Sequence, residues 1–181
     1  RILRLKQEYF FTSAGIQSIT RHYKKYDRPL NEISEHIAIH INDTHPAMCV
    51  AEFMRILLDK EHMDWDEAWQ QTVKTMSYTN HTIMAEALEK WPVEMLAKVQ
   101  PRILQIIQEI DRRYALELEG KKDHDFIERT RIIKDGMVKM AHLAIIGSHS
   151  TNGVAKLHTE LLENDVLRDF YELYPERFNN K

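Results

Sequence analysis

The sequence predicts a predominantly helical α/β fold, in which short parallel strands lie among long helices. Only five glycines and five prolines are spread through 181 residues, a composition that favours long helices over a turn-rich β protein. Two apolar runs, 37–41 and 143–146, have the length and composition of strands buried on both faces of a parallel sheet. Polar residues follow each run at once. Because ligands bind at the carboxyl ends of strands in such sheets, these positions are candidate sites.

The first helix is expected over 1–26. Its apolar residues recur at near-helical spacings, and they are Leu3, Tyr9, Phe10, Ile16 and Ile19. A turn-rich loop, 27–31, leads toward the strand at 37–41. A chain that opens on Arg1 directly within a helix is expected to be a piece of a longer protein.

Pro46 is expected to be the first residue of the next helix, because its missing N–H needs no partner there. Asp43 or Thr44 can cap that helix start. The helix should run over 46–60 and be deeply buried, since apolar side chains surround most of it.

Asp64 and Glu67 have the spacing of a capping box, which predicts a further helix start. Trp65 and Trp69 on this helix are expected to pack toward the core. The polar stretch 77–82 is then interpreted as a loop.

A helix is expected over 83–91, and Pro92 and Pro101 each suit the start of another. The second of these should be long, 101–118, because its isoleucines fall on one stripe.

The last third begins with a charged loop at 119–125 and an amphipathic segment at 126–140. The buried strand at 143–146 follows. Two short helices, 154–162 and 165–174, are expected to complete the chain.

Three polar clusters, 42–45, 79–82 and 148–153, each combine His, Asn and Thr. We expect those that follow the two strands to meet at one edge of the sheet. The clusters describe a neutral pocket suited to sugar hydroxyls, since every polar group that a sugar displaces from water must be re-paired. No metal site is expected, because no two His within a cluster have zinc-ligand spacing and Cys49 is the one cysteine.

The charge of the chain excludes several partner classes. A formal charge of −3 without a block of Lys or Arg argues against nucleic acid and against an anionic membrane surface. The chain has no apolar window long enough for a membrane span and no apolar signal-peptide core at its start. A lone cysteine favours a reducing compartment, so a cytoplasmic location is expected.

Five segments resemble signatures of the glycogen (α-glucan) phosphorylase family, of a bacterial type, and they occur in the family's order. They are 4–10 (RLKQEYF), 42–46 (NDTHP), 78–82 (YTNHT), 86–92 (EALEKWP) and 147–155 (GSHSTNGVA). Together they extend over essentially the whole chain, so the match is far more specific than any one motif.

The resemblance implies that 1–181 is a single segment from the later part of the N-terminal, Rossmann-like domain of a GT-B enzyme, without the C-terminal cofactor domain. It implies phosphorolysis of α-1,4-glucan by inorganic phosphate to glucose 1-phosphate, in a homodimeric parent that uses pyridoxal phosphate. The family's Schiff-base lysine lies outside this chain. The chain alone is therefore expected to bind no cofactor and to be inactive.

The resemblance also implies substrate-binding residues, although no catalytic one. His81 resembles the residue that bonds the glucosyl 6-hydroxyl and offers its backbone carbonyl near the anomeric carbon. The family's pocket has a polar wall beside that residue, and the residues here that resemble it are Asp43, His45 and Glu89. The loop that backs the sugar and the cofactor is matched by Asn152, Gly153 and Val154.

Two other readings of the residues remain open. One is an autonomous helical interaction module whose polar loops only cap strands and helices. The other is a small hydrolase with His81 or His149 as its base, although no Gly-x-Ser-x-Gly elbow is present.

Overall fold

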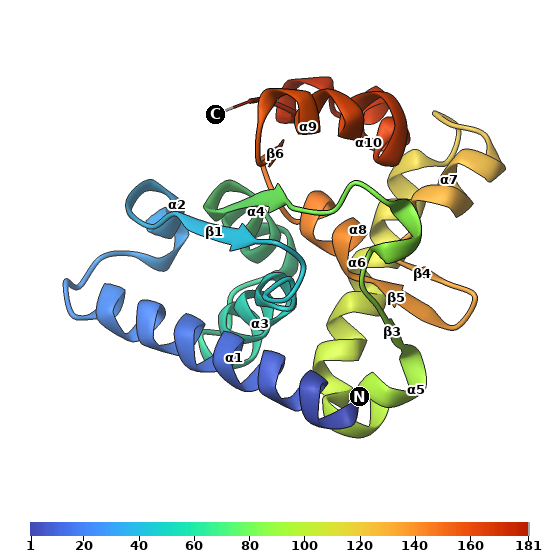
Figure 1. Cartoon of the computed structure of the whole chain (residues 1–181). Helices are drawn as coiled ribbons and strands as arrows, with labels where there is room; N and C mark the ends of the chain where they lie inside the picture. Colours follow the sequence, from blue (N-terminus) through green and yellow to red (C-terminus); the bar gives the residue numbers. More distant parts are fainter. Residues whose placement is uncertain (181) are drawn as a thin grey trace.

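The chain folds around a small parallel sheet of three strands. A computed structural model describes residues 1–180. The sheet has the order β1-β2-β6, with bounds Ile39–Asn42, Met76–Asn80 and Ser150–Gly153, and both neighbouring pairs are parallel. Figure 1 shows the arrows of β1 and β2 pointing the same way, with helices covering the sheet. The predicted helical α/β fold is confirmed.

The sheet has one buried face and one accessible polar face. Ile41, Tyr78 and Thr151 are paired across the strands and are fully buried. Their neighbours His40 and Asn42 in β1 are exposed. The prediction that the first strand is buried on both faces is therefore wrong. β1 is an edge strand, and its alternation of Ile and polar residues follows the period of two that a half-covered strand requires.

Helix α1 (Ile2–Lys24) lies along the side of the molecule opposite to the C-terminal helices, as Figure 1 shows. The helix was predicted, but its inward face was partly misplaced, because Leu3 and Phe10 are 68% and 67% exposed. Glu8 and Ser13 face inward instead. Polar groups can be buried there because α3 offers them hydrogen-bond partners.

Between α1 and β1 the chain forms two short helices, η1 (Leu30–Glu32) and α2 (Ile33–His36). After β1, Pro46 lies in a turn, and α3 (Cys49–Arg55) begins three residues later than predicted. The N–H groups of Ala47 and Cys49 bond to the carbonyls three residues before them, so the chain is a tight turn rather than an α-helix at this point. A π-helical turn, η2 (Ile56–Lys60), extends α3.

Helix α4 (Trp65–Thr75) begins as predicted, because the Asp64 carboxylate accepts a hydrogen bond from the backbone N–H of Glu67. It leads directly into β2, the central strand. The interpretation of 77–82 as a loop is therefore wrong for its first half. The polar side chains that suggested a loop are those of the accessible sheet face.

The predicted helix at 83–91 is also wrong. Only a short 3₁₀ turn, η3 (Ala85–Ala87), is present, and β3 (Lys90–Pro92) follows. Helix α6 (Pro101–Leu118) begins at its proline as predicted, and α5 (Val93–Val99) begins one residue after Pro92, which ends β3.

A second, antiparallel sheet has the order β3-β5-β4, and the sequence did not suggest it. The amphipathic segment 126–140 contains most of helix α7 (His124–Thr130) and then the hairpin of β4 (Ile133–Lys134) and β5 (Met137–Lys139). Asp135 and Gly136 form the hairpin turn with φ of 51° and 70°. Positive φ at both positions is what a tight hairpin requires.

The predicted strand at 143–146 is wrong, because these residues belong to the buried helix α8 (Met140–Ile146). A short apolar run has no periodicity that separates a buried strand from a buried helix. The strand that belongs to this part of the sheet is β6, within the predicted polar cluster 148–153.

The C-terminal elements are α9 (Lys156–Leu161), the π-helical turn η4 (Leu162–Val166), α10 (Arg168–Leu173) and η5 (Pro175–Arg177). They agree with the two short helices expected. Within residues 1–180, none of the helices combines the length and the apolar character that crossing a membrane requires.

Candidate functional site

The register of the parallel sheet places polar residues of three distant segments in one row. Asn42 pairs with Thr79, and Thr79 pairs with Asn152. One step back along the strands, His40 pairs with Ser77 on the same face. The predicted convergence of the clusters after the first and last strands is confirmed, although strand pairing through β2 brings it about rather than the strand expected at 143–146.

A chain of hydrogen bonds runs across this face. The Thr79 hydroxyl donates to Asn152 Oδ1 at 2.7 Å, so its oxygen accepts from His40 Nε2 at 2.6 Å. His40 Nδ1 then accepts from the Ser77 hydroxyl at 2.7 Å. With these partners a neutral His40 ring carries its proton on Nε2, and the bonds hold the rotamer of Thr79. The face is preorganised before any ligand arrives.

His81 follows the end of β2 and reaches back over β1. Its Nε2 lies 2.6 Å from Asn42 Oδ1. Because an amide oxygen only accepts, Nε2 carries the proton, and Nδ1 of the neutral ring is an acceptor. The ring is exposed, so Nδ1 can accept a hydrogen bond from a ligand hydroxyl.

Asp43 and His45 lie in the turn directly beyond β1. Asp43 has a φ of 64°, a conformation that Asp and Asn adopt more readily than other non-glycine residues. Its N–H donates to the Thr79 carbonyl at 2.9 Å, and its carboxylate accepts the N–H of Thr44 at 2.6 Å. His45 is exposed in the same turn.

Asn152, Gly153 and Val154 form the end of β6 and the connection to α9. Asn152 Nδ2 donates to the Gly153 carbonyl at 2.8 Å, and the Gly153 N–H donates to the Thr159 hydroxyl at 3.0 Å. The N–H of Val154 donates to His158 Nδ1 at 3.1 Å. These bonds hold the strand end against the start of α9.

Glu89 is placed differently from the other predicted site residues. Its carboxyl group lies beside Glu8 of α1, and burial together with the charge of Glu8 raises its pKa to about 7. It also lies close enough to Tyr78 that its charge, with that of Asp43, adds to the burial that raises the Tyr78 pKa. Glu89 therefore lies near Glu8 and the buried Tyr78, whereas His81 and Asn152 are hydrogen-bonded on the accessible face of the sheet.

The comparison with known proteins assigns the chain. A family model described as carbohydrate phosphorylase matches residues 1–181. The chain belongs to the carbohydrate phosphorylase family. It is 51% identical to a glycogen phosphorylase of Bacillus subtilis over 183 residues, 46% identical to one of Haemophilus influenzae, and 45% identical to the muscle form of Oryctolagus cuniculus.

These alignments cover 99 to 100% of this chain but only 22 to 23% of each relative. The chain thus spans less than a quarter of the length of the phosphorylases that it matches. The motifs that suggested the family lie on the elements described above. Each residue of the polar row belongs to one of them, namely 42–46, 78–82 or 147–155.

Two polar residues of this face lie outside the three predicted clusters, His40 and Ser77. His40 stands inside the apolar run 37–41, and Ser77 precedes the cluster 79–82. The alternation Ile39, His40, Ile41, Asn42 was the available signal, since it directs every second side chain to the accessible face.

The three stretches at the polar row offer donors for a sugar but no amine for covalent attachment of pyridoxal phosphate. Attachment requires a lysine amine, and the segments 42–46, 79–82 and 150–155 contain neither Lys nor Arg. Lys139, whose pKa is lowered by burial and by Lys134 and Lys90, lies in β5 of the other sheet. The residues of this edge therefore do not by themselves form the cofactor site.

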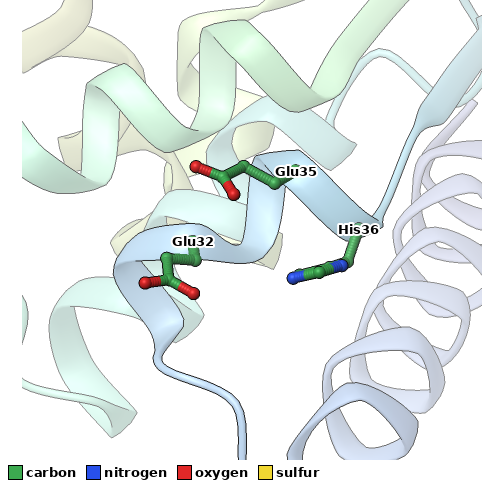
Figure 2. Close-up of side chains that lie close together, drawn as sticks. All are labelled: Glu32, Glu35 and His36. Atoms are coloured by element: carbon green, nitrogen blue, oxygen red, sulfur yellow. The ribbon is translucent and has the colours of Figure 1, made fainter.

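Among residues 1–180, one group has the proximity of a metal site, and it lies in the segment that precedes β1. Figure 2 shows Glu32, Glu35 and His36 close together, before β1, with their ligand atoms all within 4.8 Å of one another. They precede the amino end of β1, whereas the candidate site lies at its carboxyl end. All three are exposed, where carboxylates gather without a metal, so this cluster identifies no site.

Proposed function

We propose that this phosphorylase segment forms a sugar-binding wall of an enzyme that cleaves α-1,4-glucosidic bonds of glucan with inorganic phosphate and releases glucose 1-phosphate. The observation that carries the proposal is the polar row Asn42, Thr79 and Asn152 with His81 beyond it. Each of these side chains is uncharged and has a partner that fixes its direction. The activity named for the relatives is glucan phosphorolysis, since they are called glycogen phosphorylases.

The role that we propose for His81 is to bind the 6-hydroxyl of the glucosyl group being transferred. Asn42 holds Nε2, so the ring presents Nδ1 as an acceptor. A hydroxyl that leaves water needs such an acceptor, because an unpaired buried hydroxyl costs about 1–3 kcal/mol. Asp43, His45 and Glu89 are proposed to line the adjacent pocket, and the backbone at 152–154 to support the sugar from behind.

In this proposal the segment binds and orients the sugar, and it carries out none of the proton transfers. We propose pyridoxal phosphate as the cofactor of the complete enzyme, and its phosphate group would supply proton-transfer chemistry when bound. The chain's own contribution is to keep the anomeric carbon at a fixed place, which lowers the barrier by removing freedom of the reactants. We further propose that the complete phosphorylase is a cytoplasmic homodimer with one domain on each side of its cleft.

A hydrolase reading has weaker support. A histidine base normally needs a third group that orients it toward a nucleophile. His81 is held by the Asn42 amide, and His149 Nδ1 lies 3.1 Å from the Val73 backbone carbonyl. Among residues 1–180, no hydrogen bond joins either ring to a serine or cysteine side chain.

The test is the release of glucose 1-phosphate from glycogen and phosphate. We expect a complete phosphorylase containing this segment to release it, and the 181-residue chain alone to release none. The control is the same complete enzyme with Glu86→Gln, a change at an exposed position outside the polar row. Glucose rather than glucose 1-phosphate as the product would contradict the proposal, and so would turnover by the isolated chain.

A further inference from the structure

His40 in β1 is connected to a residue two strands away. Its Nε2 lies 2.6 Å from the Thr79 hydroxyl oxygen of β2, and that oxygen lies 2.7 Å from Asn152 Oδ1 in β6. The strands that carry His40 and Asn152 do not pair with each other, because β2 lies between them. Thr79 is therefore the link through which the imidazole can act on the last strand.

The direction of these hydrogen bonds is fixed at the far end, by the backbone. The Gly153 carbonyl can only accept, so the Asn152 amide must present Nδ2 to it, at 2.8 Å. Asn152 Oδ1 then faces Thr79, whose hydroxyl donates its one proton there. The Thr79 oxygen is left as an acceptor for the N–H at His40 Nε2. All three bonds from His40 to Gly153 therefore run the same way.

This order decides which group Asn152 offers to a ligand. One N–H of its amide is bonded to Gly153, and the other has no hydrogen-bond partner among residues 1–180. If nothing donates to the Thr79 oxygen, its hydroxyl can rotate away from Oδ1, and the amide is then held only by Gly153. A donating imidazole keeps the Thr79 hydroxyl directed at Asn152.

The accessible face of β1 uses the same device twice. His40 and Asn42 lie two residues apart on this face. Asn42 bonds to His81 Nε2, and His40 bonds to Thr79, which in turn bonds to Asn152. Two residues that the proposed function places at the sugar thus each depend on a β1 side chain.

We propose that His40 is a positioning residue of the sugar site, which acts through Thr79 to orient the Asn152 amide so that its free N–H bonds to an oxygen of the bound sugar. The choice of a sugar as the ligand rests on the proposed function. An amide N–H suits this ligand, because sugar hydroxyls accept hydrogen bonds as well as donate them. The imidazole transfers no proton in this role.

Two substitutions of His40 separate the roles of its two ring nitrogens. A glutamine places its amide nitrogen near the position of Nε2, so His40→Gln can still donate to Thr79. The shorter asparagine reaches only the position of Nδ1, so His40→Asn retains at most the bond to Ser77, which is 2.7 Å long in the wild type. His40 is exposed, so both variants should fold. The matched control is His62→Asn, at an exposed histidine between η2 and α4.

NMR of the ¹⁵N-labelled 181-residue chain gives a readout that needs no enzymatic activity. It measures how fast the side-chain amide protons of Asn152 exchange with water. His40→Asn should raise this rate at least about threefold, because the amide is no longer held from both sides. His40→Gln and His62→Asn should leave it unchanged. An unchanged rate in His40→Asn, or an equal rise in both His40 variants, would overturn the proposal.

Kinetics of the complete phosphorylase test whether this orientation serves the sugar. His40→Asn should lower kcat/KM for release of glucose 1-phosphate about tenfold, and His40→Gln should keep it within about threefold. In the background of Asn152→Ala, His40→Asn should cost no more than about a further twofold, because the residue through which His40 acts is gone. The full tenfold loss in that background would show that His40 does not act through Asn152.

The two kinds of measurement keep this proposal separate from the proposed function. If exchange quickens in His40→Asn alone while the complete enzyme releases no glucose 1-phosphate, the positioning of Asn152 by His40 is supported and the proposed function is overturned. If the complete enzyme releases glucose 1-phosphate and His40→Asn leaves kcat/KM unchanged, the proposed function stands and His40 has no role at the sugar site.

Discussion

Gly153 is the residue at which β6 comes closest to α9. A Cβ at this position would lie 2.8 Å from the backbone nitrogen of Thr159 and 3.0 Å from the carbonyl carbon of His158. The family resemblance named Gly153 as part of the loop behind the sugar, and the structure adds a packing reason for glycine. The end of the strand can touch the helix only without a side chain.

The change Gly153→Ala is expected to lower the free energy of unfolding by about 1–3 kcal/mol, because backbone on both sides must separate. Urea unfolding followed by circular dichroism measures it. The control is Gly15→Ala within α1, where nothing lies within 4 Å of the added methyl group. That change should stabilise the chain by about 0.5–1 kcal/mol. A neutral Gly153→Ala would show that the close contact with α9 does not constrain the strand.

A second feature at the residue scale is the pair of neighbouring carboxyl groups of Glu89 and Glu8. Glu8 Oε2, Glu89 Oε1 and Trp91 Nε1 are buried without a partner among the described residues. One proton between the two carboxyl groups gives both Glu oxygens a partner. Burial and the neighbouring charge accordingly raise the Glu89 pKa from its ordinary 4.5 to about 7. Arg4 opposes the rise only in part.

A raised carboxyl pKa makes the folded chain bind more protons than the unfolded chain between pH 4.5 and about 7. Stability must therefore fall as pH rises through this window, by about 2 kcal/mol at this half-buried position. Glu89→Gln should abolish most of that fall, because the amide stays neutral. Denaturant unfolding at pH 5 and pH 8 measures the difference. Glu86→Gln, an exposed control, should retain the wild-type dependence.

Stability that stays constant or rises from pH 5 to pH 8 would show that the two carboxyl groups do not share a proton.

At the scale of elements, α1 is joined to α3 through the fully buried Glu52. Its carboxylate accepts from the Tyr9 hydroxyl at 2.9 Å and the Ser13 hydroxyl at 2.8 Å. Arg55 adds two hydrogen bonds, at 2.8 and 2.6 Å. This network explains why a polar stripe of α1 faces inward while Phe10 and Phe11 face outward.

Glu52→Ala should lower the free energy of unfolding by about 3–5 kcal/mol, because Arg55 loses its counter-charge and the hydroxyls of α1 lose their acceptor. Thermal and urea unfolding measure the loss. The control is Glu61→Ala. Glu61 follows η2 and pairs with Lys24 of α1, so this ion pair also joins α1 to another segment, but the lysine side chain is exposed. There the loss should stay within about 1 kcal/mol. Similar losses for both variants would mean that burial of the network is not what stabilises the contact.

The elements also show where sequence reasoning succeeded. Helix starts marked by Asp64, Pro92 and Pro101 were predicted, because capping and proline geometry act locally. The central strand β2 was missed, since its accessible side chains Ser77 and Thr79 have the composition of a loop. Strand pairing is a long-range property, and nothing in 76–80 itself specifies its neighbours.

For the apolar run 143–146 the error is the reverse, because a strand was predicted where a helix is present. Its composition suits a buried strand as well as a buried helix, and only packing within the whole molecule decides between them. The clusters 42–45 and 148–153 nevertheless meet as predicted, because β6 lies within the second cluster and β2 joins it to β1.

At the scale of the whole molecule, family assignment was more secure than the strand assignments. Five ordered motifs identified the carbohydrate phosphorylase family, although two of the three parallel strands were misplaced or missed. Motif residues such as Asn42 and His81 are far apart in the chain and bonded in the fold. Their hydrogen bond could not be deduced from spacing, because it depends on the register between β1 and β2.

The central claim is that this polar edge binds the glucosyl group through His81, and one measurement tests it most directly. The complete phosphorylase carrying His81→Ala is compared with the unmodified enzyme for transfer of a glucosyl group and of a xylosyl group, which lacks the 6-hydroxymethyl. Loss of one hydrogen bond to a hydroxyl left unpaired should lower kcat/KM for glucosyl transfer about tenfold to a hundredfold. Xylosyl transfer should hardly change. Equal losses for both donors would contradict the account, because a histidine that moves protons or only supports the fold would be missed by each.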